Sequence, residues 1–367
     1  MKVIDCCKYA PKSSIKAGEA ISGGQYMFFT SSSDESKRYS DYLLDGEGII
    51  MGTGGNATLH YYSGKFAVST DCVVLLPDER IRCKYLFYFF LANMEVLERG
   101  FKGAGLKHTN KQYIGDIELG EIPSLQEQDK VIEIMDKVYE VISTGNEQVE
   151  DLDTLIKSRF VEMFGDPISN PMNWNQMTFR QAGVRLSDGP FGSNLKSEHY
   201  TDEGVRVIRL GNIGVGKFID DDKSFVSNSH YETIKKYTCK AGDIVIGTLG
   251  EPNLRACIVP ETIKFAINKA DCVHYIPKEE LFNNCFVCQY INCPETLLLA
   301  SRMIHGQTRA RISSGQIAEL PIYVPPKELQ EQFAEFVEQV DKLKVELQKT
   351  MEETQILFDS LMQRYFS

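Results

Sequence analysis

The chain contains two similar halves, and this internal repeat constrains its fold more than any other feature of the sequence. The string IIMGT at residues 49–53 corresponds to IVIGT at residues 244–248, and each apolar run leads into a glycine-rich turn. The string DCV at residues 71–73 likewise corresponds to DCV at residues 271–273. Self-similarity over most of a chain indicates repeated units of one structure. We therefore predict two front domains of the same fold.

Each half closes with a helical pattern that begins shortly after a proline, Pro123 in the first half and Pro325 in the second. The matching strings are LQEQ at residues 125–128 and 329–332, and DTL or DSL followed by a phenylalanine at residues 153–160 and 359–366. The order along the chain is therefore domain, helix, domain, helix.

Apolar residues in the two helical patterns recur mostly at alternating steps of three and four, which is typical of helices that pair through a seam. They are Val131, Met135, Val138, Ile142, Val149, Leu152, Ile156 and Met163 in the first pattern, and Leu329, Phe333, Phe336, Val340, Leu343, Leu347, Leu357 and Leu361 in the second. About 38 residues at 1.5 Å per residue give a rod of roughly 57 Å. Because the second front domain lies between the helices in the sequence, we predict an antiparallel pair with approximate two-fold symmetry.

The front part of each half consists of short β-like runs separated by Gly, Asn and Asp turns. The predicted fold class is α+β: two domains of mixed, mainly β character in tandem, with two long helices that pair as an antiparallel coiled coil. A length of 367 residues and a hydrophobic content of 43% allow more than one core. No apolar run is long enough for a membrane span and the first residues lack the apolar core of a signal peptide, so we expect a cytoplasmic protein.

The ten cysteines are expected to be reduced and buried as small apolar side chains. A zinc site is the weaker alternative. Cys285 and Cys288 have the spacing of a metal-binding pair and Cys293 follows them, but no fourth ligand is evident. We predict no metal site.

The net charge of −11 argues against nucleic-acid binding until its distribution is considered. Residues 125–165 hold ten Asp and Glu against four Lys and Arg, and residues 327–366 hold nine against five. These two segments contribute −6 and −4, which leaves −1 for the rest of the chain. The front domains can therefore carry a basic surface.

Several strings resemble those of type I restriction-modification specificity subunits, and the resemblance covers nearly the whole chain. They are FFTSS, GTGG, STDC, GLKH and DGPFGS at residues 28–32, 52–55, 69–72, 105–108 and 188–193, with the proline and Glu-Gln pair that close each half. The resemblance implies a first target-recognition domain at residues 1–124, a spacer helix at 125–165, a second target-recognition domain at 166–326 and a second spacer helix at 327–367. The sequence departs from an even repeat at its start, because the first half has no counterpart of Asn173-Trp174-Asn175.

In that family each front domain reads one half of a bipartite target in double-stranded DNA, and the helices set the spacer. The resemblance implies two modification (methyltransferase) subunits and two restriction (motor-nuclease) subunits as partners. S-adenosylmethionine for adenine methylation, ATP and magnesium are expected on those partner subunits, with no cofactor in this chain.

Two matched segments provide the clearest candidates for DNA contact. Both combine cations, which bind phosphates, with Gly, Thr or polar planar side chains that allow close approach or base reading. The candidates are Lys102, Lys107, His108 and Lys111 in the first half, and Arg302, Arg309 and Arg311 in the second. A solvated charged loop would have the same composition, but recurrence at matched positions favours DNA contact.

The glycine-rich turns and one further loop provide a second set of candidates. Tight turns need glycine with or without a ligand, so each of these segments is either a structural turn or a DNA-facing loop. The candidates are Asn56, Thr58 and His60 in the first turn, Asn253 and Arg255 in its counterpart, and Ser193, Asn194 and Lys196 in the loop of residues 187–196.

No catalytic motif is found. An adenine methyltransferase of this class would carry an Asn/Asp-Pro-Pro-aromatic motif, but VPPK at residues 324–327 lacks the amide and the aromatic residue, and NPM at 170–172 lacks the second proline. There is no phosphate-binding Gly-Lys-Ser/Thr loop for an ATP-driven motor, and the acidic run at residues 220–222 is typical of an exposed turn. We therefore predict a non-catalytic subunit with no catalytic residues.

Two alternatives stay open. In the first, the chain is itself a nuclease or methyltransferase. In the second, it is a coiled-coil scaffold or regulatory DNA-binding protein without a restriction-modification role. Basic loops in both front domains favour recognition over a scaffold.

Overall fold

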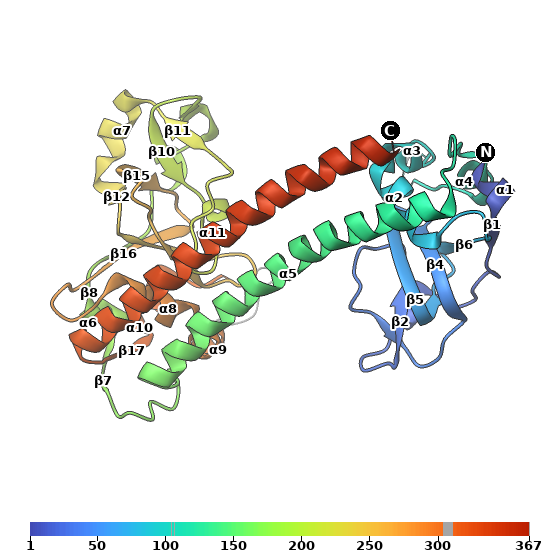
Figure 1. The fold of residues 1–367 in the computed structure, drawn as a ribbon. Coiled ribbons are helices and arrows are strands. Elements are labelled where there is room, and N and C mark those ends of the chain that lie inside the picture. Colours follow the sequence, from blue (N-terminus) through green and yellow to red (C-terminus); the bar gives the residue numbers. More distant parts are fainter. Residues whose placement is uncertain (104, 106, 304–310, 367) are drawn as a thin grey trace. The chain divides into compact units, whose positions relative to one another are not determined.

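The computed structural model describes residues 1–103, 105, 107–303 and 311–366. The chain divides into two compact units, with Met1–Glu147 and Leu347–Ser367 in unit 1 and Gln148–Glu346 in unit 2. Each unit contains one front domain and about half of each of the two long helices, α5 (Leu125–Phe164) and α11 (Lys327–Phe366), as Figure 1 shows. Among the helices of the described residues, none is long and apolar enough to cross a membrane.

Unit 1 is built on one sheet of six strands in the order β1-β6-β4-β5-β2-β3. Four short α-helices and one 3-10 helix surround it. The elements are α1 (Val3–Cys6), β1 (Cys7–Tyr9), η1 (Ala17–Glu19), β2 (Tyr26–Phe29), β3 (Arg38–Tyr39), β4 (Leu44–Gly52), β5 (Leu59–Val68), β6 (Cys72–Pro77), α2 (Cys83–Ala92), α3 (Met94–Glu98) and α4 (Lys111–Asp116).

Unit 2 contains three sheets, in the orders β12-β15-β10-β11-β9, β14-β13-β16-β8 and β17-β7. Its helices are α6 (Phe179–Ala182), α7 (Asn228–Ile234), α8 (Asn284–Asn292), α9 (Pro294–Met303) and α10 (Ser314–Glu319), with four 3-10 helices η2 (Gly192–Asn194), η3 (Ser197–His199), η4 (Leu210–Asn212) and η5 (Lys235–Tyr237). Its strands are β7 (Asn175–Thr178), β8 (Gly183–Ser187), β9 (Tyr200–Thr201), β10 (Val205–Ile208), β11 (Ser224–Val226), β12 (Thr238–Lys240), β13 (Ile244–Gly247), β14 (Arg255–Ile258), β15 (Phe265–Asn268), β16 (Cys272–Pro277) and β17 (Pro321–Val324).

The two front domains repeat the same strand pairing, which confirms the predicted repeat. In unit 1 Ile49 of β4 lies opposite Leu75 of β6, and the ladder continues to Gly52 opposite Cys72. In unit 2 β13 and β16 pair in the same register, from Ile244 opposite Tyr275 to Gly247 opposite Cys272. Alternate residues of these strands belong to different core clusters, so both faces of the sheet are covered. This explains why the strands read as continuous apolar runs.

The two front domains differ at the strand that pairs with β4 in unit 1 and with β13 in unit 2. In unit 1 the ten-residue β5 pairs with β4 and, in parallel, with β2, which joins all six strands into one sheet. In unit 2 the equivalent stretch is divided into β14 and β15, and Pro260 lies between them. Proline lacks the backbone N–H that a central strand must donate. The larger unit 2 therefore has two smaller sheets in place of one.

A buried glutamine at the start of each long helix defines the structural register of the repeat. Gln128 accepts a hydrogen bond from the Arg82 N–H at 2.7 Å and donates to the carbonyls of Arg80 and Pro123 at 3.2 and 2.9 Å. Gln330 is bonded in the same way, accepting from the Asn283 N–H at 2.9 Å and donating to the carbonyls of Leu281 and Pro325, each at 2.9 Å.

The alignment of the two LQEQ strings was therefore wrong by two residues, because it matched Gln126 with Gln330. The buried residues later in the helices agree with the structural register. Ile156, Phe160 and Phe164 of α5 are equivalent to Phe358, Met362 and Phe366 of α11, and all six are buried in their units. The predicted match of Phe160 with Phe366 was thus also wrong. The helix–domain contact, and not the repeated string, decides the register.

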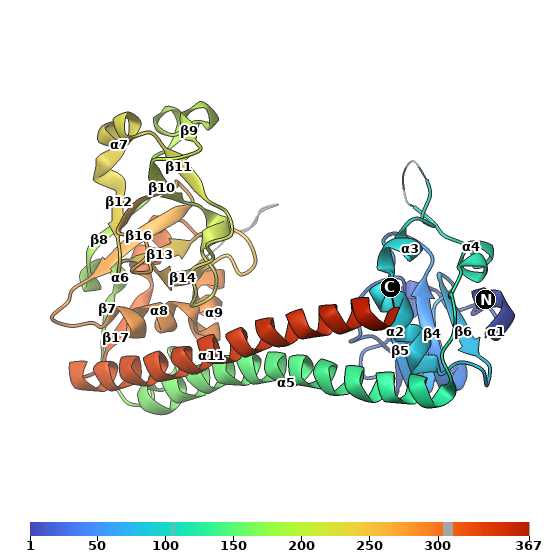
Figure 2. The same cartoon turned by 45° about the horizontal axis from the view of Figure 1, so that its top comes forward.

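The predicted antiparallel pairing is confirmed within each unit (Figures 1 and 2), but Leu343 and Leu357, which were predicted for its seam, are exposed. In unit 1 Gly145 lies against Met351, and the rings of Tyr139 and Phe358 are 6.3 Å apart, so α5 and α11 run in opposite directions. A Cβ atom on Gly145 would lie 2.7 Å from Cγ of Met351, so glycine permits the close approach there. In unit 2 Asp153 forms an ion pair with Lys344 at 2.6 Å, and Phe160 and Phe164 contact Phe333 further along.

Replacement of Gln128 tests the structural register. Gln128→Ala leaves three backbone groups without their partner, so we expect a loss of about 2–3 kcal/mol in the free energy of unfolding, measured with urea. Gln126 is exposed, and Gln126→Ala is the matched control, with an expected change within about 0.5 kcal/mol. Equal losses in both variants would contradict the register.

Candidate nucleic-acid interface

The structure brings together the two predicted DNA-contacting segments of unit 1. The backbone N–H of Gly55 donates to the Lys107 carbonyl at 2.9 Å, and the N–H of Thr109 donates to the Thr53 carbonyl at 3.0 Å. Lys102 and His108 exchange two backbone hydrogen bonds of 3.0 Å, which closes the second segment into a short ladder. The glycine-rich turn and the basic segment therefore form one surface.

The predicted polar side chains on this surface differ in their freedom to contact DNA. Asn56 and the side chains of the basic segment are exposed, which leaves them free to reach phosphates or bases. The exposed members of the basic segment are Lys102, Lys107, His108 and Lys111. Thr58 is half-buried, and its hydroxyl accepts a hydrogen bond from the Gly52 N–H at 3.1 Å. The role of these residues in binding stays a prediction.

His60 has a structural environment that differs from the one predicted. Its side chain is 7% exposed, with Nδ1 2.8 Å from Oε1 of Glu35 and Nε2 3.2 Å from the Ser32 carbonyl. Both ring nitrogens are engaged, so His60 holds the loop of residues 30–38 onto β5. We interpret it as a structural residue in place of a base contact.

Unit 2 reproduces the backbone geometry of this surface. The N–H and hydroxyl of Thr248 both donate to the Asp271 carbonyl, at 3.2 and 3.0 Å, as those of Thr53 do to the Asp71 carbonyl at 2.8 and 2.9 Å. The N–H of Ile312 then donates to the Thr248 carbonyl at 3.2 Å, in the place of the Thr109 bond in unit 1. The second basic segment thus returns to its glycine-rich turn as the first one does.

Two of the three arginines predicted in this second segment lie in the described residues. Arg311 is exposed and forms an ion pair with Asp271 at 3.2 Å. Arg302 is exposed in the last turn of α9. Arg309 lies outside the described residues.

Arg255 is committed to the protein. Its Nε donates to the Ile213 carbonyl at 2.6 Å, and its two Nη atoms donate to the carbonyls of Leu249, Pro252 and Leu210 at 2.8–3.0 Å. Four of the five donors of the guanidinium are therefore used by backbone groups. We interpret Arg255 as the residue that shapes the turn, not as a DNA contact; the neighbouring Asn253 is half-buried.

The predicted loop of residues 187–196 is attached to the first turn of α10. The hydroxyl of Ser314 in α10 donates to Oδ2 of Asp188 at 2.5 Å. Ser193, Asn194 and Lys196 are exposed, and Lys196 forms a 3.4 Å ion pair with Glu198. The structure therefore leaves these three side chains exposed on a loop that is anchored to α10 at Asp188 and to His230 of α7 at Asn194.

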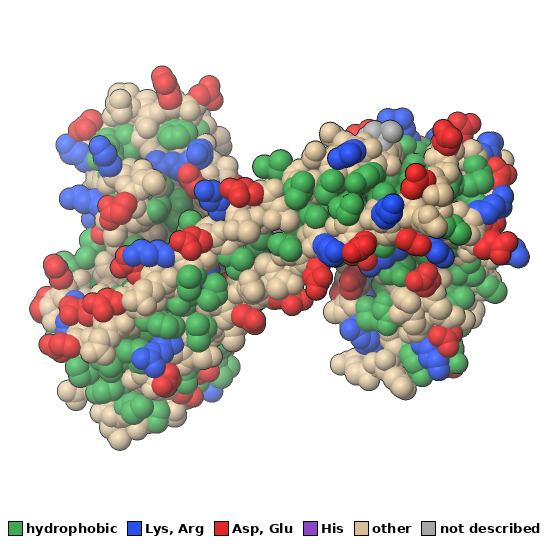
Figure 3. Space-filling model, viewed as in Figure 1, with side chains coloured by type: hydrophobic (Ala, Val, Ile, Leu, Met, Phe, Trp, Pro, Cys, Tyr) green, Lys and Arg blue, Asp and Glu red, His purple; other side chains and the backbone are tan. Residues whose placement is uncertain are grey.

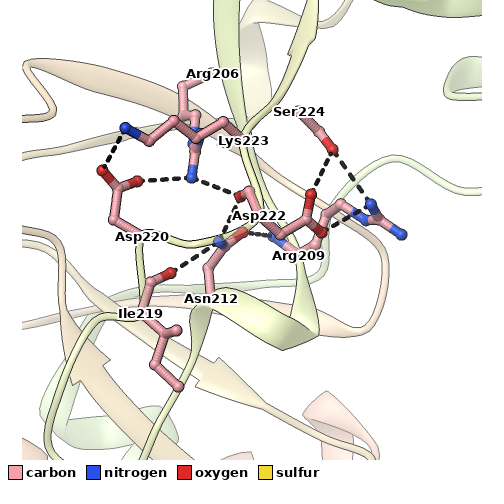
Figure 4. Close-up of polar contacts among 8 residues, drawn as sticks. All are labelled: Arg206, Arg209, Asn212, Ile219, Asp220, Asp222, Lys223 and Ser224. Carbon is pink, nitrogen blue, oxygen red and sulfur yellow. Dashed lines mark hydrogen bonds and ion pairs between the residues drawn. The ribbon is translucent and has the colours of Figure 1, made fainter. Parts of the chain in front are cut away.

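Arginines neutralise the acidic run between β10 and β11 (Figure 4). Arg206 donates to Asp220 at 2.8 Å, and Arg209 donates to Asp222 at 2.9 Å. The buried Asn212 donates to the carbonyls of Ile219 and Asp222, which ties the two ends of the loop together. Among the described residues no group of His, Cys, Asp or Glu has an arrangement that could hold a metal ion. The structure gives this acidic run a part in fixing the loop.

The weaker zinc alternative finds no support in the thiols that suggested it. Cys288 and Cys293 are buried in the core of unit 2, and Cys285 packs against that core. Burial raises the pKa of the Cys285 thiol to about 12, and it also raises the pKa of Cys288 and Cys293. Because zinc binds thiolates, this environment favours small apolar side chains over ligands.

Sequence reasoning did not include Phe191 among the candidates, although it lies in the DGPFGS string. Phe191 is exposed at the tip of the loop of residues 187–196. The sequence feature that could have identified it is an aromatic residue between a proline and a glycine, outside any periodic apolar pattern that would predict burial.

Comparisons with known proteins agree with this geometry. A family model described as the type I restriction modification DNA specificity domain matches residues 1–151 and 193–356. The specificity subunit of the type I restriction enzyme MjaVIII from Methanocaldococcus jannaschii is 22% identical over 312 residues, which cover 80% of this chain and 72% of that protein. The EcoDI specificity subunit from Escherichia coli is 23% identical over 143 residues, covering 39% of this chain and 32% of that protein.

Two solved structures share the fold. The S subunit of the type I restriction-modification system from M. genitalium superposes with a TM-score of 0.61 at 14% identity, covering 100% of this chain and 95% of that one. A chain from a structure on complex assembly and conformational transition of the type I system gives a TM-score of 0.55 at 16% identity, with coverage of 100% and 96%. The family model covers both front domains, so the chain belongs to the type I restriction-modification DNA specificity family.

Proposed function

We propose that this chain is the non-catalytic specificity subunit of a type I restriction-modification enzyme and that each unit reads one half of a bipartite DNA target. The observation that carries the proposal is the repeated surface around Thr53 and Thr248. In both units the N–H and hydroxyl of the threonine in the glycine-rich turn donate to the Asp71 or Asp271 carbonyl, and the returning segment donates one backbone hydrogen bond to the carbonyl of that threonine. Two equivalent reading surfaces on one chain suit a target with two separate halves.

The side chains on these surfaces suit the two tasks of a DNA reader. Exposed Lys107, Lys111 and Arg311 supply positive charge for phosphates, which positions the protein without reading sequence. Asn56 and Asn194 are exposed amides of the kind that bond to base edges.

We also propose that the helices set the spacer between the half-sites and dock the modification subunits. Exposed apolar residues recur at equivalent positions of the two helices, with Val141 and Leu357 in unit 1 matching Leu343 and Leu155 in unit 2. Large apolar side chains on an exposed helix face are typical of protein interfaces. Two equivalent surfaces suit two copies of one partner.

Catalysis and its cofactors belong, in this proposal, to the partner subunits. S-adenosylmethionine would bind to the two modification subunits, and ATP and magnesium to the two restriction subunits. This chain would contribute sequence recognition and the geometry of assembly.

The first experiment is single-molecule methylome sequencing of a host that expresses this chain with its modification subunit, compared with a deletion of this chain. We expect a bipartite adenine-methylation motif that disappears on deletion, because methylation would follow the sequence that this chain reads. The length of the unspecified bases in the motif gives the spacer. An unchanged methylome, with partner expression verified, would favour a scaffold or a regulatory DNA-binding protein.

Removing charge from one reading surface should affect one half-site. For the double variant Lys107→Ala and Lys111→Ala we expect roughly tenfold weaker binding to the half-site of unit 1, and a salt slope smaller by about 2 if both contact phosphates. Binding is measured by titration of DNA with either half-site scrambled. Lys137→Ala, an exposed lysine on α5, is the control. Equal loss at both half-sites would contradict two separate readers.

The proposed docking surfaces can be tested one unit at a time. Leu155→Glu with Leu343→Glu adds charge to the exposed apolar surface of unit 2, so we expect the number of bound modification subunits to fall from two to one in native mass spectrometry. Thr154 is exposed next to Leu155, and Thr154→Ala is the control. Retention of two subunits by the double variant would place the docking surface elsewhere.

A further inference from the structure

Phe191 is a large aromatic side chain that remains half exposed on a glycine-containing loop. Half of its surface, 50%, is exposed at the tip of the segment between β8 and β9. A large exposed ring in a glycine-rich, polar loop contributes little to the fold, since burial is what makes an aromatic residue stabilising. Its place in a loop beside the basic segment suggests a role in binding.

The loop that carries Phe191 is held at both ends. On one side Asp188 accepts the hydrogen bond from Ser314, and a Cβ atom on Gly189 would lie only 2.1 Å from the Asn268 carbonyl, so the loop crosses this backbone closely. On the other side Leu195 is buried, and Nε2 of His230 lies 2.9 Å from the Asn194 carbonyl. The tip is therefore ordered before any ligand binds, which lowers the entropic cost of binding.

The two residues next to Phe191 at the tip of the loop are a proline and a glycine. Pro190 and Gly192 flank the phenylalanine, and Gly192 has a φ of +55° with open space around the position of a Cβ atom. The residue that follows Phe191 therefore adds no side chain beside the ring. Proline fixes its own backbone angle and so adds rigidity on the other side.

The anchors place this tip on the reading surface of unit 2. Gly189 lies against the backbone of Asn268 and Lys269, two residues before the Asp271 whose carbonyl bonds to Thr248 and whose side chain pairs with Arg311. Gly189 of the loop, Thr248 of the glycine-rich turn and Arg311 thus all contact one short stretch, residues 268–271.

We propose that Phe191 makes an apolar contact with the bases of the half-site that unit 2 reads. Aromatic and other apolar side chains contact thymine methyl groups or insert between base steps, and both contacts depend on the base sequence in a way that phosphate contacts do not. This inference rests on the proposed function, because it assigns a reading residue to an already proposed surface.

Unit 1 offers no equivalent residue, which makes the inference specific to one half-site. There the segment that contacts the turn of residues 69–71 carries no aromatic side chain: the N–H of Thr70 donates to the Ile15 carbonyl at 2.7 Å, Ser13 and Ile15 are buried, and the exposed residues around them are Lys12, Ser14 and Lys16. The contribution of Phe191 should therefore disappear when only the half-site of unit 2 is scrambled.

The test uses the full chain assembled with its modification subunits and compares Phe191→Ala with Phe265→Ala. Phe265 is also exposed, by 45%, but lies at the opposite end of β15 from Asn268 and contacts Tyr231. We expect Phe191→Ala to weaken binding to the complete target by about 5- to 100-fold. Binding to non-specific DNA, its salt slope and the thermal unfolding of the complex should stay as in the wild type, and Phe265→Ala should change none of them.

Two modified targets distinguish the forms of base contact. A rise in fluorescence of 2-aminopurine in the second half-site, present with the wild type and lost in Phe191→Ala, would indicate insertion at a base step. A loss of wild-type affinity on replacing thymine by deoxyuridine, absent in the variant, would indicate contact with a methyl group.

Three results would overturn the inference: specific affinity unchanged in Phe191→Ala, an equal loss with either half-site scrambled, or weaker binding of modification subunits without an effect on DNA. Specific binding by the wild-type complex is measured in the same titration, so failure of the proposed function is seen separately from failure of this inference.

Discussion

Phe160 and Phe164 of α5 pack against Phe286 of α8 and Phe333 of α11, with ring centroids 4.8–5.6 Å apart. This cluster joins both long helices to the front domain of unit 2. A helix as polar as either of these does not fold stably by itself, because most helical stability in proteins comes from packing of one face. In unit 1 Phe366 plays the corresponding part against Tyr85 at 5.1 Å. In both units, aromatic contacts between residues far apart in the sequence therefore attach the long helices to the front domain.

The repeat, the strands and the long helices could be predicted because they follow from local patterns. Strings such as IIMGT and IVIGT identify equivalent strands, and the spacing of apolar residues identifies the helices. The register of the helices could not be obtained in that way. The strings LQEQ are identical, yet only Gln128 and Gln330 reach the same three backbone groups. Helix register is decided by tertiary hydrogen bonds, which leave no periodic trace in the sequence.

The candidate nucleic-acid interface could likewise be predicted only in part. The glycine-rich turns and the basic segments could each be identified from composition and recurrence, but their contact through the backbone bonds of Thr53 and Thr248 is a finding of the structure. The use of single side chains did not follow. His60 and Arg255 have the chemistry of DNA contacts, but the structure supplies each with protein partners at hydrogen-bonding distance. A residue type indicates what a side chain can bind, and only its neighbours decide whether it is free to do so.

The ion pairs of exposed cations in unit 2 affect the balance between specific and non-specific DNA binding. Arg311 is paired with Asp271, Lys196 with Glu198 and Arg209 with Asp222. Exposed ion pairs of this kind are weak, about 0–1 kcal/mol, so a phosphate can displace the carboxylate. Each displacement nevertheless reduces the gain from binding any DNA, whatever its sequence. Contacts to bases gain relative weight when the phosphate term is small, and the ratio of specific to non-specific affinity rises. The net negative charge of the two long helices also weakens binding to DNA of any sequence. The negative charge of this chain is therefore compatible with sequence recognition, and it limits binding to DNA that lacks the target.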